Sequence, residues 1–149
     1  PPNIFNIALS FLANTKISKI LIPKSVGLCD VATFKNCVNL TSIVFEDGGD
    51  VPLYVGGDLW LENTQVTILV LPFKTHRIRG YWRRGSNLNT LYVKSTIPPI
   101  LEHGWGDNPD TCDLYVPIGC KEVYASATNW GSFRTITEYD FDLNPNNVH

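Results

Sequence analysis

A repeat of 22 to 26 residues runs through most of this 149-residue chain and constrains its fold more than any other feature. Residues 11–23 recur in close form as residues 60–72, and looser copies lie between and after them. A repeat of this length cannot bury its apolar face alone, so successive copies stack as the coils of a solenoid. The equivalent apolar positions, termed anchors here, are Ile20, Ile43, Leu69, Leu91, Leu114 and Ile136. Six anchors predict about six coils.

The residues around each anchor alternate between apolar and variable positions. An alternation with a period of two is typical of a short strand that buries one face. The second apolar column, two residues after the anchors, contains Ile22, Phe45, Leu71, Val93 and Val116. We therefore expect one parallel strand per coil and little regular helix.

Two further columns predict the rest of each coil. Nine residues before the first five anchors lies an aromatic column, which we expect to stack in the core opposite the strands. Its members are Phe11, Phe34, Trp60, Trp82 and Trp105. Six residues before the anchors lies a mostly polar column that can bond the backbone of a turn. Its members are Asn14, Cys37, Asn63, Gly85 and Asn108. Three of the four tryptophans are thus assigned to the core rather than to a sugar-binding surface.

The repeat also divides the chain. Residues 1–139 are expected to form a single domain, of which residues 118–139 are a capping coil with one or two helical turns between Cys120 and Thr128. Residues 140–149 are expected to be a loose polar tail. At the amino end two alternatives stay open. Either the apolar residues among the first ten form a makeshift cap, or further repeats precede them; these residues are Ile4, Phe5, Ile7 and Leu9.

The segments 20–26 and 33–40, together with Leu114-Tyr115-Val116-Pro117, resemble the BspA-like leucine-rich repeat of bacterial secreted and surface proteins. The resemblance covers residues 11–139 and departs from the usual pattern at residues 82–86 and 104–110. It implies an α/β-type leucine-rich-repeat solenoid that is rich in strand. It also implies a protein secreted by a bacterium or held at its cell surface, and acting in adhesion or protein binding.

The strand alternation that fixes the core also fixes which side chains face outward. One residue before or after the anchors lies a continuous apolar and aromatic stripe formed by Val44, Ile68, Val70, Tyr92 and Tyr115. Apolar patches of this kind often mark contact surfaces, so we predict that the stripe binds a protein or glycan ligand outside the cell. Two alternatives explain the stripe without a ligand: the strand propensity of these residue types, or cover from a neighbouring domain if the chain is a structural spacer.

Catalytic and cofactor motifs are absent from the sequence, so we expect neither an enzyme nor a cofactor or catalytic metal. A net charge of -2 argues against a nucleic-acid partner. The longest apolar run, residues 66–73, is too short for a transmembrane segment. One cationic cluster is either a polyanion site or a solvated loop; it comprises His76, Arg77, Arg79, Arg83 and Arg84.

Two other groups of residues leave alternatives open. A carboxylate-rich segment is either a calcium loop or a set of solvated charges, and it comprises Glu102, His103, Asp107, Asp110 and Asp113. Cys29 and Cys37 are expected in the core. Cys112 and Cys120 flank an expected strand, and the sequence leaves open whether they form a disulfide.

Overall fold

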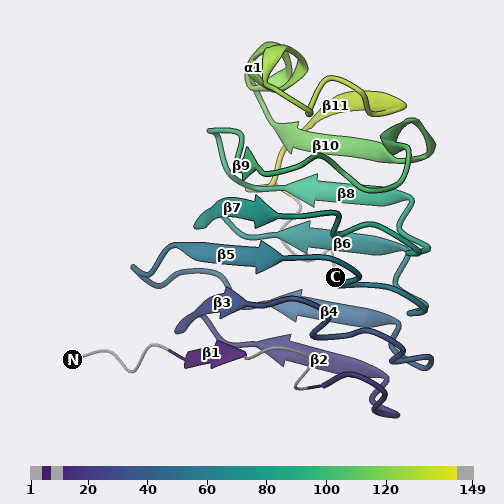
Figure 1. Cartoon of the computed structure of the whole chain (residues 1–149). Helices are drawn as coiled ribbons and strands as arrows, with labels where there is room; N and C mark the ends of the chain where they lie inside the picture. Colours follow the sequence, from purple (N-terminus) through teal and green to yellow (C-terminus); the bar gives the residue numbers. More distant parts are fainter. Residues whose placement is uncertain (1–4, 8–11, 144–149) are drawn as a thin grey trace.

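The computed structural model describes residues 5–7 and 12–143, which form a β-solenoid of about five turns (Figure 1). Every strand pair is parallel, and the strands lie on two sides of the coil. The side that carries the anchors, termed the anchor side, comprises β2 (Lys19–Ile22), β4 (Ser42–Phe45), β6 (Ile68–Leu71), β8 (Thr90–Val93), β10 (Asp113–Pro117) and β11 (Thr135–Tyr139). The second side comprises β1 (Phe5–Ile7), β3 (Val26–Cys29), β5 (Leu53–Gly56), β7 (Thr75–Arg79) and β9 (Ile100–Leu101).

The anchors pair with one another in register. Ile20 lies opposite Ile43, and Leu114 lies opposite both Leu91 and Ile136. The expectation of one strand per coil was wrong, because each complete turn has a strand on both sides. The ladder on the anchor side is interrupted between β4 and β6, which leaves a two-stranded and a four-stranded sheet there. The six anchors fall in six strands, whereas the stack comprises about five turns, so the expected six coils are not confirmed.

The aromatic column is a continuous stack through the core. Ring centroids lie 5.1 Å apart for Phe34 and Trp60, 6.0 Å for Trp60 and Trp82, and 5.6 Å for Trp82 and Trp105. Trp130 extends the stack, with its centroid 4.9 Å from that of Trp105. The predicted burial of the three tryptophans is confirmed, since each is at most 5% exposed. Phe11 lies outside the described residues.

The polar column forms a ladder of asparagines, with one correction to the sequence alignment. Asn36, not Cys37, is the equivalent of Asn14 and Asn63, because the turn of the second coil lies one residue farther from its anchor. All three asparagines have positive φ values of 58° to 61°, a conformation that asparagine tolerates better than most residues. The Asn36 amide donates to Asn14 Oδ1 at 3.1 Å, and the Asn63 amide donates to Asn36 Oδ1 at 2.7 Å. Cys37 is buried, and its thiol donates to the Leu12 carbonyl at 2.9 Å.

Replacing Asn36 with alanine should lower the free energy of unfolding by about 2 kcal/mol, because it removes two side-chain hydrogen bonds and strains the left-handed backbone. Asn36→Gly should lower it by about 1 kcal/mol, because glycine relieves the strain but not the loss of the bonds. Urea denaturation followed by tryptophan fluorescence measures both values. Asn39→Ala is the control at an exposed asparagine whose φ is not positive. Equal stability of all three variants and the parent would contradict the ladder.

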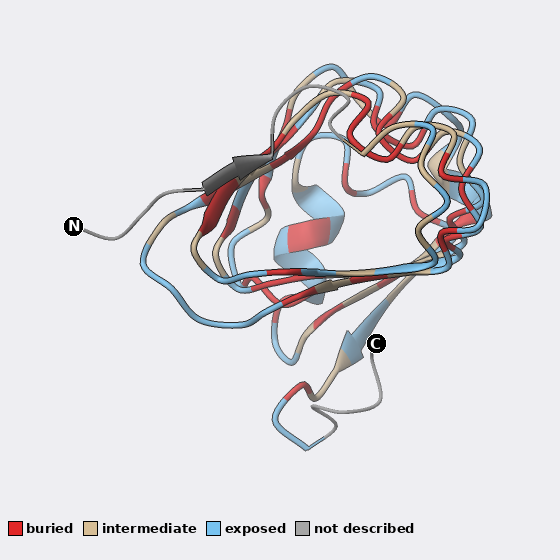
Figure 2. Cartoon of the chain, turned by 90° about the horizontal axis from the view of Figure 1, so that it is seen from below, coloured by how far each residue is buried: buried red, intermediate tan, exposed pale blue. Residues whose placement is uncertain are grey.

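The carboxyl-terminal end of the stack is closed by α1 (Lys121–Ser126), which lies across the end of the coil (Figure 2). The other described helical element is a 3-10 turn, η1 (Pro109–Thr111). Tyr124, a residue of α1, is buried, and its hydroxyl donates to the Ser95 carbonyl at 2.7 Å. Trp130 is also buried, and its indole donates to the Pro99 carbonyl at 2.9 Å. These contacts join the last coil to the corner loop of the preceding one.

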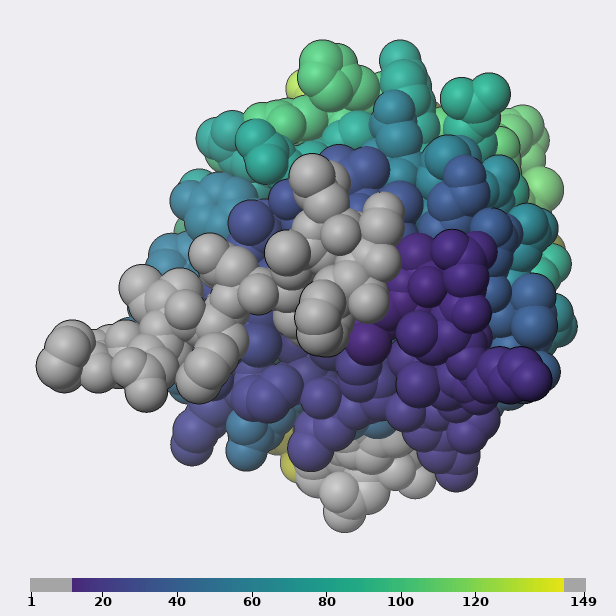
Figure 3. Space-filling model, turned by 60° about the horizontal axis from the view of Figure 1, so that its bottom comes forward, coloured from purple at the N-terminus to yellow at the C-terminus, as the bar shows by residue number. Residues whose placement is uncertain are grey.

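The two ends of the described chain differ in how they are sealed. At the amino-terminal end, which Figure 3 brings forward, Leu12, Ile17 and Ile20 pack on the core but are only partly buried.

Beyond β11, residues 140–143 are not the loose polar segment that the sequence predicts. Phe141 is only 8% exposed, and the segment that contains it leaves the anchor side outward in Figure 2. The rest of the predicted tail, residues 144–149, lies outside the described residues.

Candidate functional site

The five residues of the predicted stripe all lie on strands of the anchor side. Ile68 is 49% exposed, whereas the other four are half-buried. Val70 lies opposite Tyr92, and Tyr92 lies opposite Tyr115, so these three form one row across β6, β8 and β10. Val44 belongs to β4, across the interruption between the two ladders. The stripe therefore has an aromatic part near the carboxyl-terminal end and an aliphatic part nearer the middle of the stack.

The aromatic part is larger than the sequence predicts, because residues after β10 join it. Tyr92 and Tyr115 stack with ring centroids 4.5 Å apart and an interplanar angle of 15°. Tyr139 meets Tyr92 edge-on at 5.1 Å, and Phe141 meets Tyr139 at 5.0 Å and Tyr92 at 6.3 Å. These four residues are termed the outer aromatic cluster. Sequence reasoning missed Tyr139 and Phe141, because it assigned Tyr139 to the capping coil and Phe141 to the polar tail.

The electrostatics of the outer aromatic cluster keep its central phenol neutral. Burial raises the pKa of Tyr92, and the neighbouring phenols of Tyr115 and Tyr139 raise it further. A phenol whose pKa lies above its ordinary value of about 10 stays protonated at neutral pH and can donate or accept a hydrogen bond. The cluster thus offers aromatic faces and edges with protonated hydroxyls, which suits recognition by contact.

A hollow of about 310 Å³ adjoins this cluster. It is lined by residues 139–142, at the end of β11 and directly after it, and by Phe73, Thr96, Pro117 and Ile118. We term it the tail hollow. Phe73 is 54% exposed, and it follows β6 at the corner where the chain passes to the second side. The hollow exists because residues 140–142 lie against Phe73 and the end of β10 instead of continuing away from the stack.

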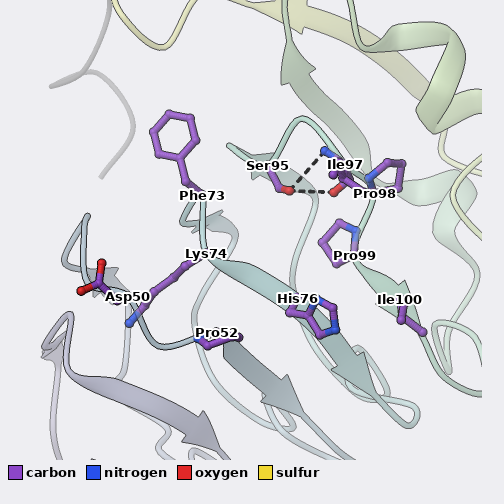
Figure 4. Close-up of a pocket in the computed structure, with 10 residues that line it drawn as sticks. All are labelled: Asp50, Pro52, Phe73, Lys74, His76, Ser95, Ile97, Pro98, Pro99 and Ile100. Atoms are coloured by element: carbon purple, nitrogen blue, oxygen red, sulfur yellow. Dashed lines mark hydrogen bonds between the residues drawn. The ribbon is translucent and has the colours of Figure 1, made fainter. Parts of the chain in front are cut away.

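A second cavity, the corner pocket, has a volume of about 440 Å³ and shares Phe73 with the tail hollow. Figure 4 shows Phe73 and the Lys74 side chain on one side of this pocket, with Pro98 and Pro99 on the other. The Lys74 ammonium donates to the Lys24 carbonyl and, at 2.9 Å, to that of Val26. Burial lowers the pKa of Lys74, although Cys29 and Glu46 oppose the change. Because the Lys74 ammonium is hydrogen-bonded to these backbone carbonyls, its charge stabilises the fold. The other residues that line the corner pocket are mainly apolar.

The residues of the carboxylate-rich segment, for which a calcium loop was one alternative, do not converge. Glu102 pairs with Arg77 at 2.5 Å and with Arg79 at 3.7 Å, while Asp107 accepts the Gly85 amide at 2.8 Å. Asp113 forms a bidentate pair with Arg134, and these hydrogen bonds lower its pKa to about 2. Within residues 12–143 and β1, no group of three potential metal ligands is present. The structure therefore supports the alternative of separate loop charges.

The cationic cluster is also divided, because Arg83 is only 3% exposed while Arg77 and Arg79 pair with Glu102. Arg83 points into the coil and donates to the carbonyls of Leu88 and Asn108. A single basic patch for a polyanion is thus not formed by these residues.

The four cysteines are buried and free, so Cys112 and Cys120 are not bridged. Burial raises the pKa of Cys29 to about 12 and that of Cys112 to about 11. Thiols with such values are protonated at neutral pH and react weakly, because the thiolate is the nucleophile. The prediction that Cys29 and Cys37 belong to the core is confirmed.

Comparison with known proteins gives no relative from which a site can be transferred. No protein-family model matches the chain, and no curated protein matches it. Among the described residues, no helix is both long and apolar enough to cross a membrane.

Proposed function

We propose that this chain is a non-catalytic recognition module that binds a protein or glycan ligand through the outward face of its anchor side. The supporting observation is that this face carries the outer aromatic cluster in one row with Val70, with the exposed Ile68 two residues away on the same strand, beside a hollow of about 310 Å³. A sheet face in contact with water alone is usually polar, whereas contiguous apolar surface is typical of contact sites. Aromatic residues are also the side chains that contribute most to binding at protein interfaces.

The solenoid suits such a role because it holds these side chains rigidly. Neighbouring parallel strands lie about 4.8 Å apart, so one row of outward side chains repeats at that spacing. The row of Val70, Tyr92, Tyr115 and Thr137 crosses four hydrogen-bonded strands. A face that is ordered before binding loses little conformational entropy when a ligand arrives.

We further propose that the solenoid is of the BspA-like leucine-rich-repeat type and that the protein acts at the bacterial surface or outside the cell. The repeat length, the registered anchors and the similarity of residues 11–139 to that family support this assignment. Members of one fold carry many functions, so the assignment supports the class of protein and not the ligand.

A structural spacer is the second candidate function, and the position of Phe141 favours it. Phe141 packs on Tyr92 and Tyr139, so part of the aromatic surface is already satisfied within the chain. In a spacer the remaining apolar side chains, Ile68 and Val70, would be present only because β-branched residues favour the strand conformation. The two candidates therefore differ in whether Ile68 contributes to binding.

The test compares Ile68→Asp with Ile100→Asp on arrays of extracellular proteins and glycans. Both isoleucines are about half exposed, at 49% and 48%, but Ile68 lies on the anchor side and Ile100 on the second side. We expect Ile68→Asp to weaken any binding found with the parent protein at least tenfold, because it places a charge in an apolar contact. Ile100→Asp should bind as the parent does. Equal effects of the two variants, or no ligand for the parent, would favour the spacer.

A further inference from the structure

We propose that the tail hollow binds a basic side chain, an arginine guanidinium, presented by the partner protein. This inference rests on the proposed recognition function and deepens it by naming the chemistry that the site selects. The hollow combines three properties that such a group requires: aromatic rings, a carboxylate at the rim, and a set of described lining residues of which none is basic. Each of these is a property of residues that line it.

Aromatic rings form a large part of the lining. Phe73, Tyr139 and Phe141 all border the hollow, and they come from two segments that are far apart in the sequence. A guanidinium is planar and weakly hydrated, so it stacks on such rings and is attracted to the negative charge of their faces. Phe73 already takes part in a contact of this kind, because the Lys94 ammonium lies 6.0 Å from its ring centroid.

The rim of the hollow carries the negative charge of the exposed Asp142. Asp140 and Asp142 border the hollow, and none of the described residues that line it is basic. The Asp140 carboxylate accepts the backbone amides of Asp142 and Leu143, both at 3.0 Å, which fixes the turn that carries the two acids. Asp142 is exposed at the rim, where a carboxylate can pair with an arriving guanidinium.

Lys94, whose ammonium lies over the ring of Phe73, does not oppose this assignment. Lys94 is only 5% exposed, and its ammonium pairs with Asp47 at 2.5 Å. Its charge is therefore balanced by a carboxylate outside the lining. The volume of the hollow, about 310 Å³, lies at the small end of the range for ligand sites and suits one side chain better than a whole cofactor.

The experiment titrates the full chain with the peptide acetyl-Gly-Arg-Gly-amide and, in parallel, with the same peptide carrying citrulline in place of arginine. Citrulline keeps the shape of arginine and removes its charge. Aromatic NMR signals of Phe73, Tyr139 and Phe141 report binding at low ionic strength. We expect the arginine peptide to shift these signals to saturation, with a dissociation constant at least tenfold lower than that of the citrulline peptide. Equal shifts with both peptides, or none with either, would overturn the proposal.

Two variants test the location of binding. Asp142→Asn should weaken the arginine peptide at least threefold, because it removes a rim carboxylate. Asp110→Asn, the matched control, changes an exposed aspartate of η1, at the opposite end of β10 from the hollow, and should leave binding unchanged. If both variants weaken binding equally, the peptide is attracted by net charge alone and the proposal fails.

Failure here and failure of the proposed function give different results. If the arrays yield a ligand that Ile68→Asp weakens, but the arginine peptide does not bind, the recognition function stands and the tail hollow is not its arginine site. If the arginine peptide binds as described but no ligand depends on Ile68, the proposed binding face fails and the hollow remains a site for a basic side chain.

Discussion

Replacement of Trp82 by alanine is expected to lower the free energy of unfolding by about 4 kcal/mol, the largest effect of any single substitution proposed for this chain. Trp82 is 1% exposed and lies in the middle of the aromatic column, in contact with Trp60 and Trp105. Alanine leaves a cavity that the parallel ladders on both sides prevent from collapsing. Small domains are stable by only about 5 to 15 kcal/mol, so the variant should unfold at much lower urea concentration.

Two companion variants separate the causes of that loss. Tyr81→Ala removes a neighbouring aromatic side chain that is 43% exposed, and it should cost less than about 1 kcal/mol. Trp82→Phe should cost about 1 to 2 kcal/mol, because the ring contacts largely persist and the buried Trp82 indole N–H, which has no acceptor among the described residues, is removed. Equilibrium urea denaturation measures all three. A loss for Tyr81→Ala as large as that for Trp82→Ala would show that the column is not the centre of the core.

The anchor side and the aromatic column could be predicted because both depend on a sequence period. Each anchor repeats the same local environment, and a period of two around it is sufficient to define a buried strand face. The second side could not be predicted in this way, because its strands lack a clear alternation. In β3, three of the four residues are buried, and β5 ends at Gly56, whose φ is 84°. A side chain at Gly56 would come within 2.9 Å of Trp82 Cβ, so this glycine is required by close packing rather than by a strand pattern.

The candidate site was predicted in part for the same reason. Alternation placed Tyr92 and Tyr115 on the outward face, but nothing local to residues 140–143 indicates that Phe141 returns to Tyr92, which precedes it by 49 positions. A contact between distant segments depends on the path of the tail, and polar composition around Phe141 suggested a loose end instead. The tail hollow, which requires that return, was consequently outside the reach of sequence reasoning.

The position of Arg83 shows a further limit of sequence reasoning and leads to the second large expected effect. By composition it belongs to a surface cluster, yet it is buried and donates to the carbonyls of Leu88 at 2.8 Å and Asn108 at 3.1 Å. It also donates to the Thr111 hydroxyl at 3.3 Å. Its guanidinium therefore provides hydrogen-bond donors for backbone carbonyls in turns, which no neighbouring strand pairs with. Arg83→Ala should lower the free energy of unfolding by about 3 kcal/mol, since it removes these bonds and a buried stem together.

Arg83→Met distinguishes the two contributions, because methionine keeps an apolar stem of similar length without the donors. It should cost about 2 kcal/mol, less than alanine, and the difference measures the packing of the stem. Arg84→Ala changes the adjacent exposed arginine and should alter stability by no more than about 0.5 kcal/mol. Urea denaturation of the three variants in parallel is the measurement. If Arg84→Ala is as destabilising as Arg83→Ala, or if Arg83→Met is as stable as the parent, then the guanidinium does not hold the turn and its burial needs another cause.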